Sequence, residues 1–228
     1  MGRAEIFSML LSFIFLVLFL ALMSGCAARK EEPGMEVEPE AAPEIELTRG
    51  QKRIAAWHKL MNEKRNASEM EKLETVNRFF NLLEFVDDRI LWGKDDYWAT
   101  PRQMLLKNGG DCEDFATAKY FTLRQLKIPE YKMRLTYVKV LRLKQPHMVL
   151  NYYVEPTADP LILDSLVKTI LSASEREDLV PIYSFNGQGL WLAKKEKSIL
   201  LGRSESLSSW LDLQLRFTRE ALADPLFP

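Results

Sequence analysis

The sequence has few of the residue types that most often carry redox and metal chemistry. Its 228 residues include two cysteines, Cys26 and Cys112, and two histidines, His58 and His147. With so few thiols, a metal-storage or redox role for a cysteine is disfavoured. An excess of charge of one sign is also missing, because 31 basic and 32 acidic side chains leave a net charge of -1. The chain therefore lacks the basic field of a nucleic-acid-binding protein, and we expect no nucleic-acid partner.

Residues 1–25 are predicted to be a lipoprotein signal peptide. After Arg3, an apolar run from Ile6 to Met23 is broken only by two serines and leads to Ser-Gly-Cys at Cys26. This ending resembles a bacterial lipobox, which predicts cleavage before Cys26 and attachment of lipid to its thiol. The residue after Cys26 is Ala27 and not Asp, which resembles the sorting signal of outer-membrane lipoproteins. We therefore expect a periplasmic domain with a lipid anchor in the outer membrane. The alternative is an uncleaved transmembrane anchor, because the run is close to the length that spans a bilayer.

The rest of the chain is predicted to consist of a tether and one domain. Residues 26–47 are rich in Glu, Pro and Ala and have no hydrophobic periodicity, which is typical of a flexible linker. Residues 48–228 are numerous enough to bury a single core. If Cys26 is acylated, Cys112 has no disulfide partner in an oxidising compartment, which favours a catalytic role for its thiol.

Apolar periodicity predicts helices first, then strands, then a final helix. Spacings of three and four predict helices over 48–66 and 68–90, and a further helix starts at Cys112 and stops before Pro129. Pro101 is expected to open a short helix between them. Alternating apolar residues predict strands, with a last helix over 206–223; the strands are 132–143, 147–154, 160–166, 181–185 and 190–193. Short connections favour antiparallel neighbours, so the sequence predicts an α+β domain.

Cys112 lies where a loop signal gives way to a helix signal. Gly109 and Gly110 permit a tight turn, and Asp111 is a favoured residue type for the helix N-cap. A thiol in the first turn of a helix meets the positive end of the helix dipole, which favours the nucleophilic thiolate. The alternative interpretation is a buried structural cysteine at a helix start.

A cysteine nucleophile needs a base, and the base needs a third group that orients it. His147 opens one predicted strand and Asp164 ends the next. If these strands pair antiparallel, the two side chains can lie side by side, with the carboxylate holding Nδ1–H of the imidazole. We therefore expect a Cys112–His147–Asp164 triad, whereas His58 is expected to be a surface or packing residue. The alternatives are a surface histidine at a strand end and an aspartate that only forms a turn.

Five short segments surround these residues: Trp92-Gly93, residues 96–101 (DYWATP), 110–116 (GDCEDFA), 146–150 (PHMVL) and Leu163-Asp164. In these segments the chain resembles the bacterial transglutaminase-like cysteine peptidases, and more closely the LapG-type periplasmic proteases that release biofilm adhesins. The resemblance covers about residues 68–185. It implies a papain-like, transglutaminase-like core with the catalytic cysteine at a helix N-terminus packed on an antiparallel sheet. It also implies that the matching cysteine, histidine and aspartate form the triad and that activity depends on calcium.

The acidic neighbours of Cys112 agree with the calcium dependence that the resemblance implies. Asp111, Glu113 and Asp114 place three negative charges beside the thiol, and like charge disfavours the thiolate. A bound Ca²⁺ takes oxygen ligands and would neutralise these carboxylates; Asp95 or Asp96 could add ligands. The alternative interpretation is that the acidic residues only stabilise the helix N-terminus.

The resemblance implies a calcium-dependent cysteine endopeptidase that cleaves a large cell-surface adhesin near its N-terminus, between small residues. An inner-membrane cyclic-di-GMP receptor that sequesters the protease is the implied partner. The backbone N–H of Cys112 is expected to be the first oxyanion donor, with Gln103 or the indole of Trp98 as candidates for the second. Two alternatives stay open at this point: acyl transfer to an amine by the same triad, as in a transglutaminase, or a non-catalytic binding lipoprotein.

Overall fold

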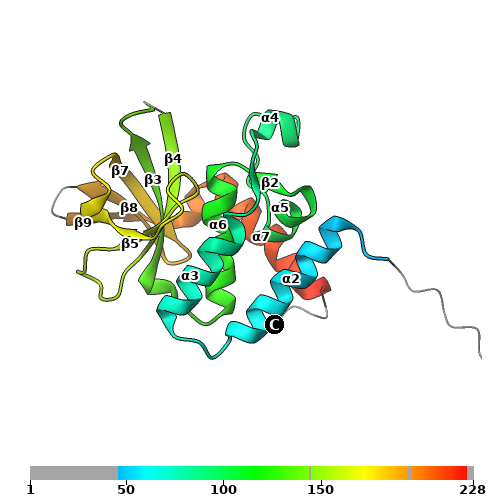
Figure 1. The fold of residues 1–228 in the computed structure, drawn as a ribbon. Coiled ribbons are helices and arrows are strands. Elements are labelled where there is room, and N and C mark those ends of the chain that lie inside the picture. Colours follow the sequence, from blue (N-terminus) through cyan, green and yellow to red (C-terminus); the bar gives the residue numbers. More distant parts are fainter. Residues whose placement is uncertain (1–45, 144, 195–196, 225–228) are drawn as a thin grey trace, which may run out of the picture. The chain divides into compact units, whose positions relative to one another are not determined.

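The computed structural model describes residues 46–143, 145–194 and 197–224 (Figure 1). The predicted signal peptide, Cys26 and all of the predicted tether except residues 46 and 47 lie outside the described residues. Within the described ranges, no helix is both long enough and apolar enough to cross a membrane.

Helices precede strands along the chain, as the periodicity predicts. The N-terminal elements are α2 (Arg49–Lys64), α3 (Glu69–Phe80), β1 (Glu84–Phe85), α4 (Asp88–Leu91), α5 (Pro101–Lys107), β2 (Gly109–Gly110) and α6 (Cys112–Gln125). A short 3-10 helix, η1 (Glu130–Lys132), leads into the strands, which are β3 (Met133–Val140), β4 (Gln145–Tyr152), β5 (Leu161–Leu163), β6 (Leu171–Ser172), β7 (Leu179–Asn186), β8 (Gly189–Lys194) and β9 (Lys197–Gly202). The remaining elements are two 3-10 helices, η2 (Ala173–Glu175) and η3 (Ser204–Ser206), and the last helix, α7 (Ser208–Ala223). The α+β prediction is confirmed.

The main sheet has seven strands in the order β6-β5-β4-β3-β7-β8-β9. Every neighbouring pair in it is antiparallel, as the short connections predict. Tyr137 on β3 lies opposite Met148 on β4 and opposite Tyr183 on β7. Side chains of directly paired residues share one face of a sheet, so these three residues form a row across its middle.

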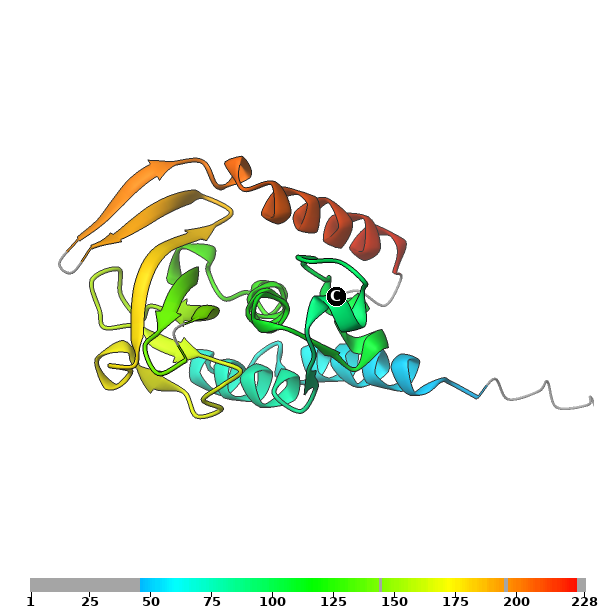
Figure 2. The same cartoon turned by 90° about the horizontal axis from the view of Figure 1, so that it is seen from above.

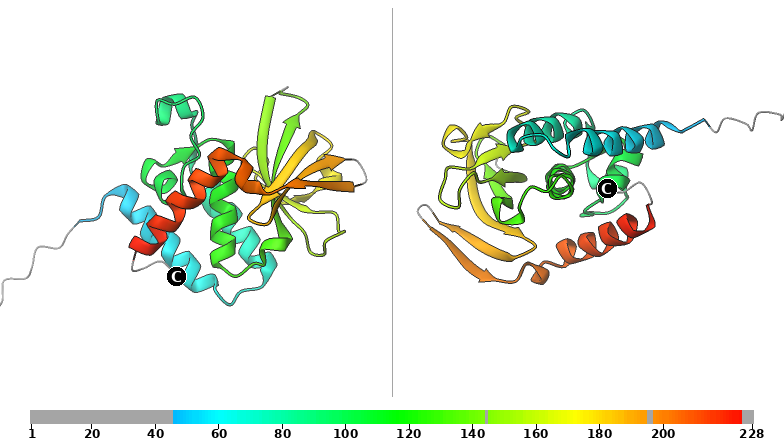
Figure 3. Two further views of the ribbon diagram at one scale, coloured as in Figure 1. Left: turned by 180° about the vertical axis from the view of Figure 1, so that it is seen from behind. Right: turned by 90° about the horizontal axis from the view of Figure 1, so that it is seen from below.

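Helix α6 is the central element of the described fold. In the view of Figure 2 it is seen end-on, with the sheet on one side, α2 and α3 below and α7 above, and the views of Figure 3 agree. Phe121 of α6 stacks against Trp210 and Phe217 of α7, with ring centroids 5.5 and 4.1 Å apart. On its other flank, the indole N–H of Trp57 in α2 donates to Thr122 Oγ1 over 2.9 Å. Through these contacts, α2 and α7 both pack against α6, the helix that begins at Cys112.

The helix predicted over 68–90 was wrong in its second half, because α3 ends at Phe80. Beyond it, the backbone N–H groups of Glu84 and Val86 donate to the carbonyl oxygens of Asn108 and Gly110. These two bonds flank a short parallel ladder in which β1 pairs with β2. Backbone pairing with a distant segment therefore replaces the helix that local periodicity favours.

Candidate active site

Cys112 is the first residue of α6, and the ladder of β1 and β2 sets its position. A Cβ atom added to Gly109 would lie 2.7 Å from the carbonyl oxygen of Glu84, and one added to Gly110 would lie 2.4 Å from Asp114 Oδ2. The two glycines are therefore required by close approach of neighbouring atoms, in addition to the turn that the sequence predicts. A larger residue at either position would push the start of α6 away from its neighbours.

Gly109→Ala should lower the free energy of unfolding by about 1–3 kcal/mol, the usual cost of an added methyl group in a filled site. The new Cβ would meet backbone, which cannot rotate away. Urea unfolding at constant m-value measures the change. An unchanged midpoint would show that β1 can move aside.

The thiol of Cys112 is free and partly buried. It donates to Glu113 Oε2 over 2.9 Å, and it also contacts the backbone N–H of Met148, the residue after His147. Burial, followed by the negative charge of Glu113, raises the pKa of this thiol well above its usual range. The surroundings of Cys112 therefore disfavour its thiolate, despite its place at a helix N-terminus.

His147 and Asp164 are brought together, as predicted. Nε2 of His147 lies 2.7 Å from Asp164 Oδ1, and only 2% and 1% of these residues are exposed. The expectation that Asp164 holds Nδ1–H is wrong, because the bonded nitrogen is Nε2. A carboxylate at Nε2 favours the tautomer with its proton there, which leaves Nδ1 able to accept a proton from the thiol. His58 lies apart from these residues, buried in α2 beside Asp224.

Asp164 stays ionised although it is buried. Burial acts to raise its pKa, but the hydrogen bond and charge of His147, the backbone N–H of Leu166 and the guanidinium of Arg176 together hold its pKa well below the usual range. A permanent negative charge beside the imidazole is what a residue that orients and stabilises an imidazolium must supply.

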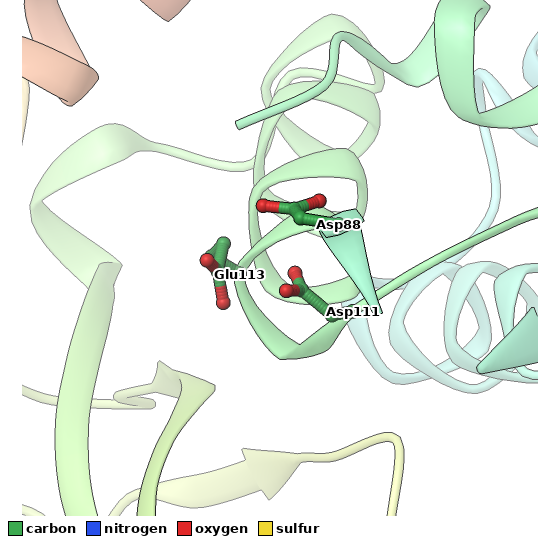
Figure 4. Close-up of side chains that lie close together, drawn as sticks. All are labelled: Asp88, Asp111 and Glu113. Atoms are coloured by element: carbon green, nitrogen blue, oxygen red, sulfur yellow. The ribbon is translucent and has the colours of Figure 1, made fainter. Parts of the chain in front are cut away.

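The carboxylates of Asp88, Asp111 and Glu113 lie close together, as Figure 4 shows. Oxygens of Asp88, Asp111 and Glu113 all lie within 4.8 Å of one another. Asp111 occupies the N-cap position of α6, but its side chain makes no capping hydrogen bond. Asp111 is thus the N-cap residue that its type suggests, but its carboxylate lies near the other two acidic groups and does not supply the capping bond.

The acidic cluster leaves polar atoms without partners. Among the described residues, Asp88 Oδ1, Asp111 Oδ1 and Asp114 Oδ2 are buried and accept no hydrogen bond. Burial raises the pKa of Asp88 to about 6, and burial with the charges of Glu113 and Asp114 raises the pKa of Asp111 to about 10. Burial likewise raises the pKa of Asp114. Crowded carboxylates with unused oxygens have the chemistry of a hard-cation site.

The predicted metal ligands are placed unequally. Asp111 and Glu113 are in the cluster, whereas Asp114 accepts the backbone N–H of Ala99 through Oδ1, over 2.6 Å, and turns Oδ2 toward Gly110. The metal roles of these residues stay predictions. Sequence reasoning missed Asp88, because it fell inside the helix predicted over 68–90. The preceding Asp87, which caps α4 by accepting the N–H of Arg89, was the signal that could have placed it.

Asp95 and Asp96 lie outside the three-residue cluster. Asp95 pairs with Arg89 over 2.9 Å, and Asp96 accepts the indole N–H of Trp98 over 3.0 Å. The indole of Trp98 is thus engaged. Gln103 is also engaged, because its Nε2 donates to the hydroxyl of Tyr97 over 3.0 Å while its Oε1 accepts the N–H of Thr100. Neither candidate for the second oxyanion donor is free in this arrangement.

A cleft of about 550 Å³ opens over Cys112. Its walls combine aromatic, acidic and serine side chains; besides Cys112 they are Asp95, Asp96, Trp98, Glu113, Tyr137, Pro146, Met148, Tyr183 and residues 206–209. Tyr137 and Tyr183 stack with centroids 5.1 Å apart. Trp98 lines the cleft, whereas the nearby Trp92 and Tyr97 contact each other.

Comparison with protein families matches residues 49–196 to the family described as bacterial transglutaminase-like cysteine proteinase. The chain belongs to this family. Comparison with curated proteins found no match. The family assignment identifies the chain as a cysteine peptidase.

Solved structures similar to this cysteine proteinase include three of LapG from Legionella pneumophila. EGTA-treated LapG is 45% identical, with a TM-score of 0.69 over 75% of this chain and 91% of LapG. LapG without a stated treatment is 45% identical, with a TM-score of 0.68 over the same shares of the two chains. Calcium-bound LapG is 44% identical, with a TM-score of 0.67 over 75% of this chain and 92% of LapG. The transglutaminase-like fold expected from the resemblance is confirmed.

Proposed function

We propose that this cysteine proteinase is a calcium-dependent endopeptidase that cleaves a large cell-surface adhesin near its N-terminus and so controls biofilm attachment. The observation that carries the proposal is the buried His147–Asp164 pair, together with a free thiol of Cys112 that lines an open cleft and contacts the backbone N–H of Met148, the residue after His147. Support for the substrate class is the similarity to LapG over 75% of this chain. An open cleft of this kind accommodates an extended polypeptide.

The peptidase reaction follows from the three side chains. Nδ1 of His147 takes the proton of the Cys112 thiol as Sγ bonds to the carbonyl carbon of the substrate, and the backbone N–H of Cys112 stabilises the oxyanion. The imidazolium then gives its proton to the departing amine as the C–N bond breaks. Water next attacks the thioester, giving one proton to His147, which returns it to sulfur as the C–S bond breaks. Asp164 keeps the imidazole in the required tautomer throughout.

The acidic cluster fits Ca²⁺ by its chemistry. Asp88, Asp111 and Glu113 would hold the ion, and the unpartnered Oδ2 of Asp114 is buried nearby. A bound Ca²⁺ supplies positive charge that neutralises carboxylates and favours the ionised thiol of Cys112. A calcium-bound structure of LapG supports this part of the proposal.

Asp88→Asn should raise the dissociation constant for calcium by about tenfold or more, because even indirect partners of metal ligands cost 10–100-fold in affinity. The cluster loses one of its three charges, and Asp88 is only 2% exposed. Calorimetric titration with calcium measures the change without any substrate. Asp95→Asn is the matched control, because Asp95 lies outside the cluster and pairs with Arg89. Equal weakening by both substitutions would contradict the assignment of Asp88.

Location and partners complete the proposal. Lipid on Cys26, followed by the predicted tether of residues 26–47, would hold the peptidase at the periplasmic face of the outer membrane. An inner-membrane cyclic-di-GMP receptor would sequester it. The lipobox-like end of the apolar run supports the anchor. Metabolic labelling with a fatty-acid analogue, with Cys26→Ala as control, tests it: label that persists in Cys26→Ala would exclude lipidation at this cysteine.

The function is tested by incubating the chain from residue 27 onward with an N-terminal fragment of a candidate adhesin. Cleavage is expected with calcium and not with a chelator or in Cys112→Ala. A labelled amine added to the same reaction separates hydrolysis from acyl transfer. Incorporation of the amine without cleavage would show a transglutaminase instead of a protease. An intact fragment with no amine incorporated would leave a binding lipoprotein as the better account.

A further inference from the structure

Arg176 lies behind the catalytic pair and is only 4% exposed. It follows η2 and contacts two carboxylates at once. Its Nη1 donates to Asp164 Oδ2 over 2.8 Å, while Nε and Nη2 donate to the two carboxylate oxygens of Asp178 over 2.9 and 3.0 Å. Asp164 is the residue whose other oxygen holds His147. One guanidinium therefore joins the catalytic carboxylate to a second acidic group that is closer to solvent.

We propose that Arg176 is a positioning residue of the peptidase: it fixes the Asp164 carboxylate so that His147 keeps its proton on Nε2 and presents Nδ1 to Cys112. This inference rests on the proposed cysteine-peptidase mechanism and adds a fourth member to it. Arg176 acts through Asp164 and touches neither the substrate nor the reacting atoms.

The bonds of Asp164 show why the orientation depends on Arg176. Its backbone carbonyl accepts from the amide of Asn81 and from Nζ of Lys119, each over 2.9 Å, which fixes the main chain. The carboxylate is fixed separately. Oδ1 accepts from His147 and from the N–H of Leu166, and Oδ2 accepts from Arg176.

Removing Arg176 would leave Oδ2 buried without its donor. A buried acceptor without a partner is unfavourable, and the carboxyl group relieves it by rotating or by taking up a proton. Either change weakens the bond that sets the tautomer of His147. The geometry of the active-site base therefore depends on a residue twelve positions after Asp164 in the sequence.

Asp178 explains how a cation can lie so close without cancelling the charge that His147 needs. It forms a two-bond pair with Arg176, and its side chain is 27% exposed. The charges of Arg176 and Asp178 largely offset each other, so the charge of Asp164 remains available to the imidazole. A planar guanidinium can donate to two carboxylates from three separate nitrogens in a fixed plane, whereas all the donors of a lysine lie on one nitrogen.

The test uses the small number of histidines. His58 and His147 give the only imidazole ¹⁵N signals of the chain, and loss of one set in His147→Gln assigns them. The protein with calcium should show a single His147 tautomer with a strongly downfield proton on Nε2. In Arg176→Met we expect that proton signal to disappear and the two nitrogen shifts to approach each other. We also expect kcat for the adhesin fragment to fall at least about tenfold with KM within about twofold.

Arg53→Met is the matched control. Arg53 is also partly buried, and its guanidinium donates to the carbonyl oxygens of Leu105 and Leu106, far from Asp164 in the sequence. It should lower the melting temperature without changing the His147 signals or kcat. Compared with Arg176→Met, Arg176→Lys should restore part of the lost kcat, because it returns the positive charge but not the planar set of guanidinium donors.

The outcomes separate the inference from the proposed function. A melting temperature lowered in Arg176→Met, with His147 signals and kcat as in the parent, would show a purely structural role and overturn the inference. If Arg176→Met does not fold, Arg176→Lys decides, and full kcat with unchanged His147 signals would overturn the inference. If the parent protein cleaves no adhesin but the imidazole signals change as expected, the proposed substrate is wrong and the role of Arg176 stands.

Discussion

Asp164→Asn should lower kcat by about 10³- to 10⁴-fold, the size of effect seen when the orienting carboxylate of a catalytic triad is replaced by an amide. The substitution keeps the shape of the side chain and removes its charge. KM for the adhesin fragment should change little, because Asp164 is only 1% exposed and lines no part of the cleft. Steady-state kinetics with calcium present measure both constants.

The loss follows from the donors around Asp164. If the amide NH₂ of the new asparagine faces His147, Nε2 must become an acceptor and the proton moves to Nδ1, where it blocks transfer from the thiol. If the NH₂ faces Arg176 instead, two donors meet in a buried site. Neither orientation satisfies both partners. Because Arg176 keeps Asp178, unfolding should become easier by less than the ~3–5 kcal/mol typical of a broken buried ion pair.

Asp178→Asn is the control for Asp164→Asn. It removes the other carboxylate bound to Arg176 but leaves the bond between Arg176 and Asp164. We expect kcat to stay within about tenfold of the parent. A full parental kcat in Asp164→Asn would exclude Asp164 from the mechanism.

Removing calcium should lower the rate of cleavage by at least about 100-fold, and restoring calcium should return it. The physical reason is the charge beside Cys112. Burial and the carboxylate of Glu113 together raise the pKa of the thiol. Neutralising Asp111 and Glu113 removes the repulsion that disfavours the thiolate.

A chelator titration in the cleavage assay measures the effect, and calcium added back is its control. The unfolding temperature should fall in parallel, because three buried carboxylate oxygens lose the partner that a cation would provide. Magnesium should be a poor substitute, since it demands octahedral geometry at short distances. Cleavage that continues at full rate in excess chelator would remove the calcium role from the acidic cluster.

The sequence predicted the parts of this protein that local pattern determines. The helix that begins at Cys112, the antiparallel strands that carry His147, and the pairing of His147 with Asp164 are all present in the structure. The helix and the strands depend on signals within a few residues, such as glycines before a helix or alternating apolar side chains, and the pairing of His147 with Asp164 follows from the short connection between two such strands. The family resemblance then added the fold that connects them.

Other features depend on contacts between distant segments and could not be predicted. The ring nitrogen that faces Asp164 is set by how β4 and β5 pair, and the sequence gives no orientation for an imidazole. Asp88 joins Asp111 only because β1 and β2 lie side by side. No sequence pattern singles out Arg176. Its contact with Asp164 arises only because the turn after β6 folds back onto that residue.

The residues that line the cleft come from stretches that are far apart in the sequence. Cys112 lies within residues 49–196, which the family model matches, whereas residues 206–209, around the start of α7, lie beyond that range and line the same cleft. One part of the cleft wall therefore lies outside the range that the family model matches. Substitutions within residues 206–209 would change this part of the cleft wall while leaving Cys112, His147 and Asp164 as they are.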